Sequence, residues 1–135
     1  MSAFDATKSE PDFLCKTVEV AINSGATTVS ISDSLGVASP EEFSKLIQYI
    51  INRVPNIDWA ILSVHCHDDI GMAVDNSIAA LNCGVRQIEC AINGLGARKG
   101  NADLAEVVME VLKQKNYQIG INTSLIKSAS ELVKK

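Results

Sequence analysis

Apolar residues recur at helical spacing in five segments of the chain. Spacings of three and four residues predict helices near residues 9–25, 39–54, 72–83, 102–114 and from 123 onward. The second is the clearest, because Ser39 and Glu42 form a capping-box pattern around Pro40. Ser9 is the expected N-cap of the first helix, and Gly25 is placed to end it.

Three short strand-like runs, 27–31, 60–64 and 87–92, separate these helices. The alternation of strand and helix predicts a parallel α/β sheet. The polar residues that follow or end the runs are Asp33, His65 and Asn93, and their spacings of 32 and 28 residues each match one βα unit. Parallel α/β folds place their sites at the carboxyl ends of strands, so we expect the chemistry there.

The length of the chain limits the architecture. Three βα units cannot close an eight-fold barrel, which takes about 250 residues, whereas this chain has 135. A free-standing parallel sheet of three strands would leave two edges unpaired. The pattern therefore indicates a piece of a larger α/β structure.

Composition excludes several classes of partner. The net charge is −4 and the pI is about 5.1, so neither nucleic acid nor an anionic membrane is an expected partner. No apolar run approaches the roughly 20 residues of a membrane span, and charged residues interrupt the N-terminus where a signal peptide would be apolar. The four cysteines form no C-x-x-C pair and are expected to be reduced core residues of a cytoplasmic protein.

The strongest chemical signal is the segment His65-Cys66-His67-Asp68-Asp69. Residues two apart on a strand point to the same side, so both imidazoles can face one divalent metal ion. Two exposed loop histidines are the alternative. A metal would need further oxygen ligands. Asp68 and Asp69 could supply one, cap the following helix or orient the imidazoles.

Two further clusters are weaker. The loop 93–101 holds three glycines and opens onto a helix, which suits either close approach to an anionic ligand or a simple turn of the chain. It matches neither a Walker A motif nor a dinucleotide fingerprint. Asp33-Ser34 by itself indicates a turn after a strand.

Taken together, the segments LSVHCHDDIGMAVDNS, AINGLGARKGNADLAEVVM and INTSLIKSASELV resemble the 2-isopropylmalate synthases, within the pyruvate-carboxylase-like and HMG-CoA-lyase-like TIM barrels. The resemblance implies an α/β fold: the C-terminal part, about three βα units, of a TIM (β/α)8 barrel, followed by the first helix of a linker subdomain. Residues 1–116 would belong to the catalytic barrel, starting at the end of its fifth strand, and residues 117–135 to the linker subdomain.

The resemblance also implies a metal-dependent Claisen condensation of acetyl-CoA with 3-methyl-2-oxobutanoate, a step of leucine biosynthesis. His65 and His67 match the metal-binding histidines of the family, and Asn101 matches an asparagine near the metal. Ser34 stands where the family usually has a threonine that contacts the 2-oxo acid. The expected metal is Mn²⁺ or Mg²⁺, with Zn²⁺ as a further candidate. The full-length enzyme would be a homodimer.

The departures from the family are also informative. The D-G-x-Q strand, with its arginine and its metal-binding aspartate, does not occur in this sequence. No residue of this chain is therefore singled out as catalytic, and the isolated chain is expected to be inactive without the N-terminal half of the barrel. Phe4 and Ala97 stand where the family often has glutamates. The alternatives are a fragment of a citramalate or homocitrate synthase, or an inactive truncated remnant.

Overall fold

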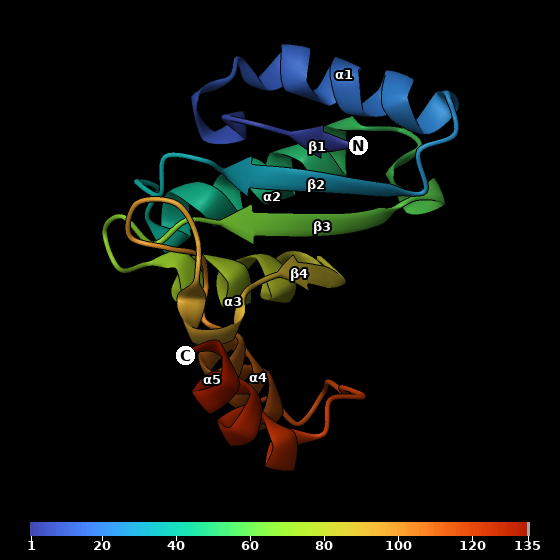
Figure 1. The fold of residues 1–135 in the computed structure, drawn as a ribbon. Coiled ribbons are helices and arrows are strands. Elements are labelled where there is room, and N and C mark those ends of the chain that lie inside the picture. Colours follow the sequence, from blue (N-terminus) through green and yellow to red (C-terminus); the bar gives the residue numbers. More distant parts are fainter. Residues whose placement is uncertain (135) are drawn as a thin grey trace.

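The computed structural model describes residues 1–134 and contains one parallel sheet of four strands in chain order (Figure 1). The strands are β1 (Ser2–Ala3), β2 (Thr28–Asp33), β3 (Ile61–Cys66) and β4 (Gln87–Glu89). The helices are α1 (Pro11–Asn23), α2 (Pro40–Arg53), α3 (Ala73–Cys83), α4 (Leu104–Lys113) and α5 (Ile126–Val133). Single 3₁₀ turns are η1 (Ala6–Lys8), η2 (Ile57–Trp59), η3 (Ile92–Gly94) and η4 (Thr123–Leu125).

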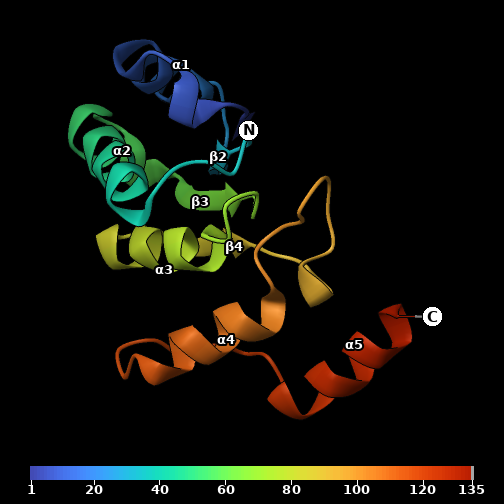
Figure 2. The same ribbon diagram turned by 90° about the vertical axis from the view of Figure 1, so that its left-hand side faces the viewer.

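The helices α1, α2 and α3 form one layer on one face of the sheet (Figure 2). The strand side chains toward this layer are apolar and almost fully buried, as the 0% exposure of Val29, Ile31 and Val64 shows. Phe43, also 0% exposed, lies in the same core cluster. Burial of this single apolar layer is what holds the βα units together.

The opposite face of the sheet is polar. In register across β2, β3 and β4, Ser32 pairs with His65 and His65 with Glu89, and the row before it pairs Ser30 with Ser63. No helix among residues 1–134 covers this face (Figure 2). In a closed barrel the same face would line the interior.

The five predicted helices are confirmed, and Ser39 and Glu42 form the predicted reciprocal cap. The predicted N-cap of the first helix was wrong. Glu10 caps α1, because its carboxylate accepts from the N–H groups of Asp12 and Phe13 while Pro11 takes the first helical position.

The strands also differ from the prediction in length. β3 continues to Cys66, so His65 lies within the strand. β4 ends at Glu89, which leaves Asn93 in η3 with a φ of 57°, outside the strand end where the sequence placed it. The chain then turns before it can extend the ladder.

The four cysteines are free, as predicted, but only Cys15 and Cys66 are buried. Burial raises the pKa of the Cys66 thiol to about 12, which makes it a poor metal ligand or nucleophile. Cys83 and Cys90 are half-buried. Within residues 1–134, none of the helices has the length and apolar character needed to cross a membrane.

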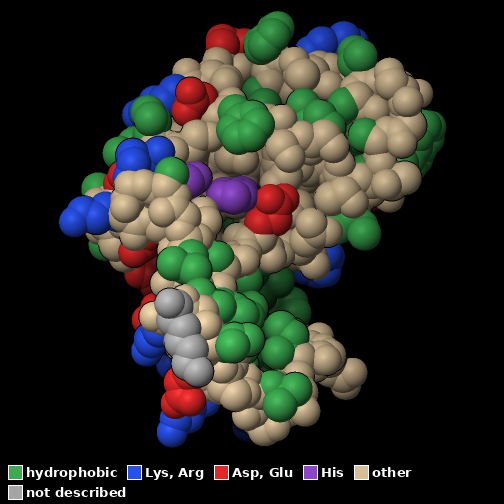
Figure 3. All heavy atoms as spheres, in the orientation of Figure 1, with side chains coloured by type: hydrophobic (Ala, Val, Ile, Leu, Met, Phe, Trp, Pro, Cys, Tyr) green, Lys and Arg blue, Asp and Glu red, His purple; other side chains and the backbone are tan. Residues whose placement is uncertain are grey.

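We expect the 135-residue chain by itself to associate, because β1 and β4 each have one unpaired edge within the described residues and large apolar side chains are exposed. Figure 3 shows hydrophobic side chains gathered on the uncovered side. Sedimentation velocity should detect species heavier than 14.5 kDa.

The substitution Ile61→Lys, at a residue that is 49% exposed on the polar face, should raise the monomer fraction. The matched control Asn82→Lys, on the exposed surface of α3, should leave the fraction unchanged. A single 14.5 kDa species with a cooperative melt in the unsubstituted chain would contradict this expectation.

Candidate functional site

The carboxyl ends of the parallel strands bring the predicted site residues to one edge of the sheet. His65 lies near the end of β3 on the polar face, and its histidine neighbour His67 follows directly after the strand. Both imidazoles, drawn in purple, reach the surface on this face (Figure 3). Their ring centroids are 5.1 Å apart and the ring planes differ by 28°. The predicted pairing of the two histidines on one side is confirmed.

His65 lies between two hydrogen-bond acceptors. Its Nδ1 is 3.0 Å from Glu89 Oε2, and its Nε2 is 2.9 Å from Asn101 Oδ1. The orientation of the amide is set by Asn101 Nδ2, which donates to the Leu95 carbonyl at 2.7 Å. A neutral imidazole has only one N–H, so an N–H toward Glu89 leaves two lone pairs facing each other at Asn101. A cation or a proton between them would satisfy both.

Glu89 is a half-buried carboxylate on the neighbouring strand. Burial by itself raises the pKa of Glu89, but the hydroxyl and imidazole groups around it outweigh burial and lower the pKa below its usual range. Ser63 donates one of these hydrogen bonds, at 3.2 Å. An ionised Glu89 favours the tautomer of His65 that carries its hydrogen on Nδ1 and presents Nε2 as a ligand.

His67 supplies a second available nitrogen. Its Nδ1 is buried and has no hydrogen-bond partner among the described residues. Burial lowers the pKa of His67, and the neighbouring His65 and Arg98 lower it further, so the ring remains neutral at physiological pH. A neutral imidazole stacked on the ring of His65 is of the ligand type that divalent metals take.

The two aspartates after the histidines have other roles. Asp68 Oδ1 accepts from the Ala73 N–H at 2.9 Å and so caps the start of α3, one of the alternatives the sequence left open. Asp69 forms an ion pair with Arg98, whose guanidinium lowers the pKa of that carboxyl. Residues 1–134 contain no cluster of three or more His, Cys, Asp or Glu side chains with metal-binding geometry.

The orienting carboxylate is Glu89, which the sequence reasoning missed. A signal was present, because Glu89 is the only acidic residue in the run 87–92, which is otherwise mostly apolar. The run did not show which neighbouring strand Glu89 would face. The register of β3 and β4 determines that.

The glycines of the loop 93–101 allow one part of the loop to pack closely against another part of the same loop. A Cβ at Gly96 would overlap Asn101 Nδ2, and one at Gly100 would overlap the Gly94 carbonyl oxygen. Gly100 also has a φ of +105°. The loop is thus folded tightly around Asn101, which forms an isolated bridge with His67. These contacts support the turn interpretation of the glycines.

Ser34 and Asn93 have separate surroundings. Ser34 Oγ accepts from the Asp5 N–H at 2.8 Å, which leaves its hydroxyl hydrogen able to donate. Asn93 donates to the Ser130 carbonyl of α5 at 3.1 Å and is not among the residues around the histidines.

Asp33, at the end of β2, holds together η1 and the loop after β2. Its carboxylate is buried and accepts from Thr7 Oγ1 at 3.0 Å and from the Ala38 N–H at 3.1 Å. The sequence indicated only a turn at this position, and the two hydrogen bonds show what holds that turn.

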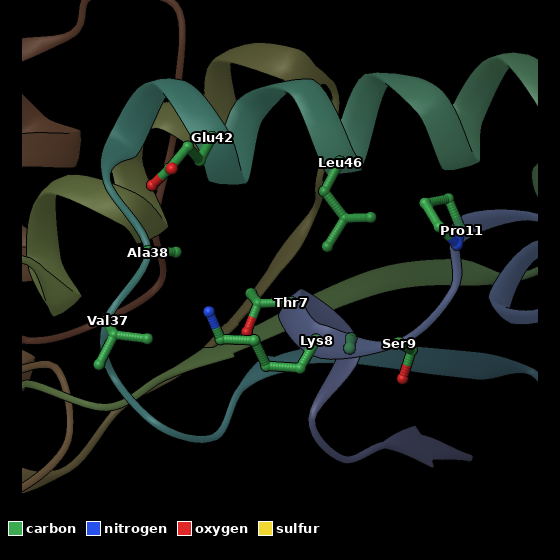
Figure 4. A pocket seen from close by; sticks show the side chains of 9 residues that line it. Thr7, Lys8, Ser9, Pro11, Val37, Ala38, Glu42 and Leu46 are labelled. Carbon is green, nitrogen blue, oxygen red and sulfur yellow. The ribbon is translucent and has the colours of Figure 1, made fainter.

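Two hollows lie at this end of the sheet. One, of about 380 Å³, is lined by Asn101, Asp68 and Lys99 among others and borders the candidate metal ligands. Another, of about 290 Å³, lies between η1 and α2, where Thr7 and Lys8 face Glu42 and Leu46 (Figure 4). The histidines line neither hollow.

Comparisons with known proteins identify the family and the fold of the chain. Residues 1–133 match the HMGL-like family. The chain is 50% identical to a 2-isopropylmalate synthase of Methylorubrum populi and 51% identical to one of Aquifex aeolicus, in each case over 98% of this chain and 26% of the relative. The HMG-CoA lyase structure from Brucella melitensis superposes with a TM-score of 0.78 at 26% identity, covering 92% of this chain and 44% of that one.

The chain thus spans about a quarter of the length of the curated relatives it matches. Its four strands and their helices are a partial TIM barrel, which confirms the fold class expected from the sequence.

Gly96→Ala is expected to destabilise the chain by about 1–3 kcal/mol, because the added Cβ would overlap the Asn101 amide. Gly120→Ala is the matched control, since a Cβ there meets nothing within 4 Å. Urea denaturation of both variants measures the difference. Equal free energies of unfolding for the two variants would show that the loop adjusts to the added Cβ without loss of stability.

Proposed function

The chain belongs to the HMGL-like family, and on that premise we propose that it forms the C-terminal part of the catalytic barrel of a 2-isopropylmalate synthase. The observation that carries the proposal is the cluster of His65, His67 and Asn101, in which His65 Nε2 lies 2.9 Å from Asn101 Oδ1 and the two imidazole rings are stacked. The proposed reaction is the Claisen condensation of acetyl-CoA with 3-methyl-2-oxobutanoate. Residues 1–116 would be the barrel part and 117–135 the start of a linker subdomain.

His65, His67 and Asn101 are the residues that would hold a divalent metal, Mn²⁺ or Mg²⁺, with Zn²⁺ as a further candidate. When bound, such an ion supplies Lewis-acid polarisation of the carbonyl of the 2-oxo acid. A carboxylate ligand and an arginine would come from the first barrel strand, whose D-G-x-Q motif does not occur among these 135 residues. The proposed partner is therefore the rest of the barrel, and the full-length enzyme is proposed to be a homodimer.

The residues of this chain have definable roles in that site. Glu89 accepts from His65 Nδ1 and keeps Nε2 directed toward Asn101. The buried surroundings of His67 keep its ring neutral. The Ser34 hydroxyl, whose oxygen already accepts from Asp5, can donate its hydrogen to the carboxylate of the 2-oxo acid.

We expect divalent-metal affinity to require both His65 and His67, and to fade as pH falls through about 6.5, where free imidazole protonates. Because burial lowers the pKa of His67, that ring loses its lone pair only at a lower pH than a free imidazole. With two imidazoles and one amide oxygen, Zn²⁺ or Co²⁺ should bind more tightly than Mg²⁺. Calorimetric titration of the chain, His65→Ala and His67→Ala measures these affinities.

Cys66→Ala serves as the control, because Cys66 lies between the two histidines but is fully buried on the other face of the strand. If either histidine variant binds Zn²⁺ as tightly as the unsubstituted chain, the two histidines are not the metal site.

The isolated chain is expected to release no CoA from acetyl-CoA in the presence of a 2-oxo acid. Activity should appear when this chain replaces the corresponding quarter of the Aquifex aeolicus enzyme, which supplies the remaining strands. In that chimera, His65→Ala should lower the rate by about 100-fold or more, the usual loss for a group that stabilises developing charge. Asn82→Ala, on the surface of α3, is the control.

A panel of 2-oxo acids separates the alternatives. Preference for 3-methyl-2-oxobutanoate supports the proposal, whereas preference for pyruvate or 2-oxoglutarate would indicate a citramalate or homocitrate synthase. A folded but inactive chimera would favour the inactive remnant. Restoring the family glutamates with Phe4→Glu and Ala97→Glu would then test whether those two departures cause the loss.

A further inference from the structure

Arg98 connects three loops at the carboxyl end of the sheet. Its Nε and Nη2 donate to the two carboxylate oxygens of Asp69 at 2.8 Å each, in the loop after β3. Nη2 also donates to the Ser34 carbonyl at 2.6 Å, in the loop after β2. Arg98 itself belongs to the loop after β4. Bidentate pairing of a guanidinium with a carboxylate fixes orientation as well as distance.

The backbone at Arg98 is held in an unfavourable conformation. Its φ is 55°, in the left-handed region that side chains rarely adopt. The other non-glycine residues with positive φ among residues 1–134, Asp5 and Asn93, also lie in loops at this end of the sheet. Such a conformation persists only where the surroundings enforce it, and the three hydrogen bonds of the guanidinium do so here.

The carboxylate of this ion pair packs against backbone, while the guanidinium partner remains half exposed. A Cβ at Gly36 would lie 2.6 Å from Asp69 Oδ2, so the loop after β2 closes directly over the carboxylate. The side chains of Arg98 and Asp69 are 47% and 20% exposed, whereas those of the surface pair Arg53 and Asp12 are 58% and 61% exposed, so the difference lies mainly in the carboxylate. The Arg98–Asp69 pair is therefore better placed to constrain its neighbours.

The Arg98–Asp69 ion pair lies close in sequence to the candidate metal ligands His67 and Asn101. Asp69 follows His67 by two residues and Arg98 precedes Asn101 by three, and between them the Asp68 N–H donates to the Gly100 carbonyl at 2.9 Å. We propose that Arg98 and Asp69 are positioning residues, which hold Asn101 and Ser34 in place relative to His67. This inference rests on the proposed function, because it takes His67 and Asn101 as metal ligands and Ser34 as a substrate contact.

The first test is Co²⁺ titration of the 135-residue chain, followed by the absorption spectrum of the bound ion. Arg98→Met and Asp69→Asn should each weaken Co²⁺ binding by about tenfold and alter the spectrum, as the loss of groups that orient metal ligands does. The double variant should bind no more weakly than either single variant, because the two residues act through one contact. Arg53→Met, which removes the more exposed ion pair between α1 and α2, should change neither.

The exchanged pair Asp69→Arg with Arg98→Asp should recover only part of the affinity, because the ion pair is restored with reversed polarity and aspartate tolerates the positive φ, but the hydrogen bond to the Ser34 carbonyl is lost. Arg98→Lys keeps the charge without the bidentate geometry and should bind Co²⁺ with intermediate affinity. These two variants separate loss of positioning from general loss of folding.

A second measurement needs no metal. Trypsin should cleave after Lys99 several-fold faster in Asp69→Asn than in the unsubstituted chain, because the loop is released from its anchor. Unchanged cleavage together with unchanged Co²⁺ affinity would overturn the positioning role and leave the proposed function intact. An unsubstituted chain that binds no Co²⁺ would count against the proposed function, and faster cleavage in Asp69→Asn would then still support the attachment of the loops.

Discussion

The rest of this structure depends on one constraint: successive side chains of a parallel strand point to opposite faces of the sheet. In β2 and β3, one set of alternate residues is apolar except for Asp33 and packs under α1, α2 and α3, while the other set is mostly small or polar. The hydrophobic effect orients the whole sheet through the first set. The second set is thereby brought to one surface, where Ser32, His65 and Glu89 form a row in register.

The other residues of the candidate site lie beyond that row, in the loops at the carboxyl ends of the strands. His65 is positioned by its own strand, its tautomer by Glu89 of the next strand, and its open nitrogen faces Asn101 of the glycine loop. Hydrogen bonds between loops then connect the βα units: the Asp5 N–H donates to Ser34 Oγ, and Arg98 Nη2 donates to the Ser34 carbonyl. The proposed ligands are thus gathered at one end of the sheet, and hydrogen bonds connect the loops around them.

The same geometry explains the role of the glycines and of the buried polar groups. Gly96 and Gly100 let the loop close on Asn101, and Gly36 lets the neighbouring loop close on Asp69. Asp33 is fully buried, yet both of its carboxylate oxygens accept hydrogen bonds from the flanking segments. Buried polar groups of this kind hold a specific loop conformation because breaking either hydrogen bond leaves an unsatisfied charge.

The sequence by itself determined the helices, the parallel α/β class and the pairing of His65 with His67 on one side of a strand. These are local properties, since helical spacing, caps and strand alternation each act over a few residues. It did not reveal that Glu89, rather than Asp68 or Asp69, orients His65, or that Arg98 joins three loops. Those partners lie 24 residues from His65 in the first case and 29 and 64 residues from Arg98 in the second. Only the register of neighbouring strands and the folding of their loops decide which of such distant residues meet.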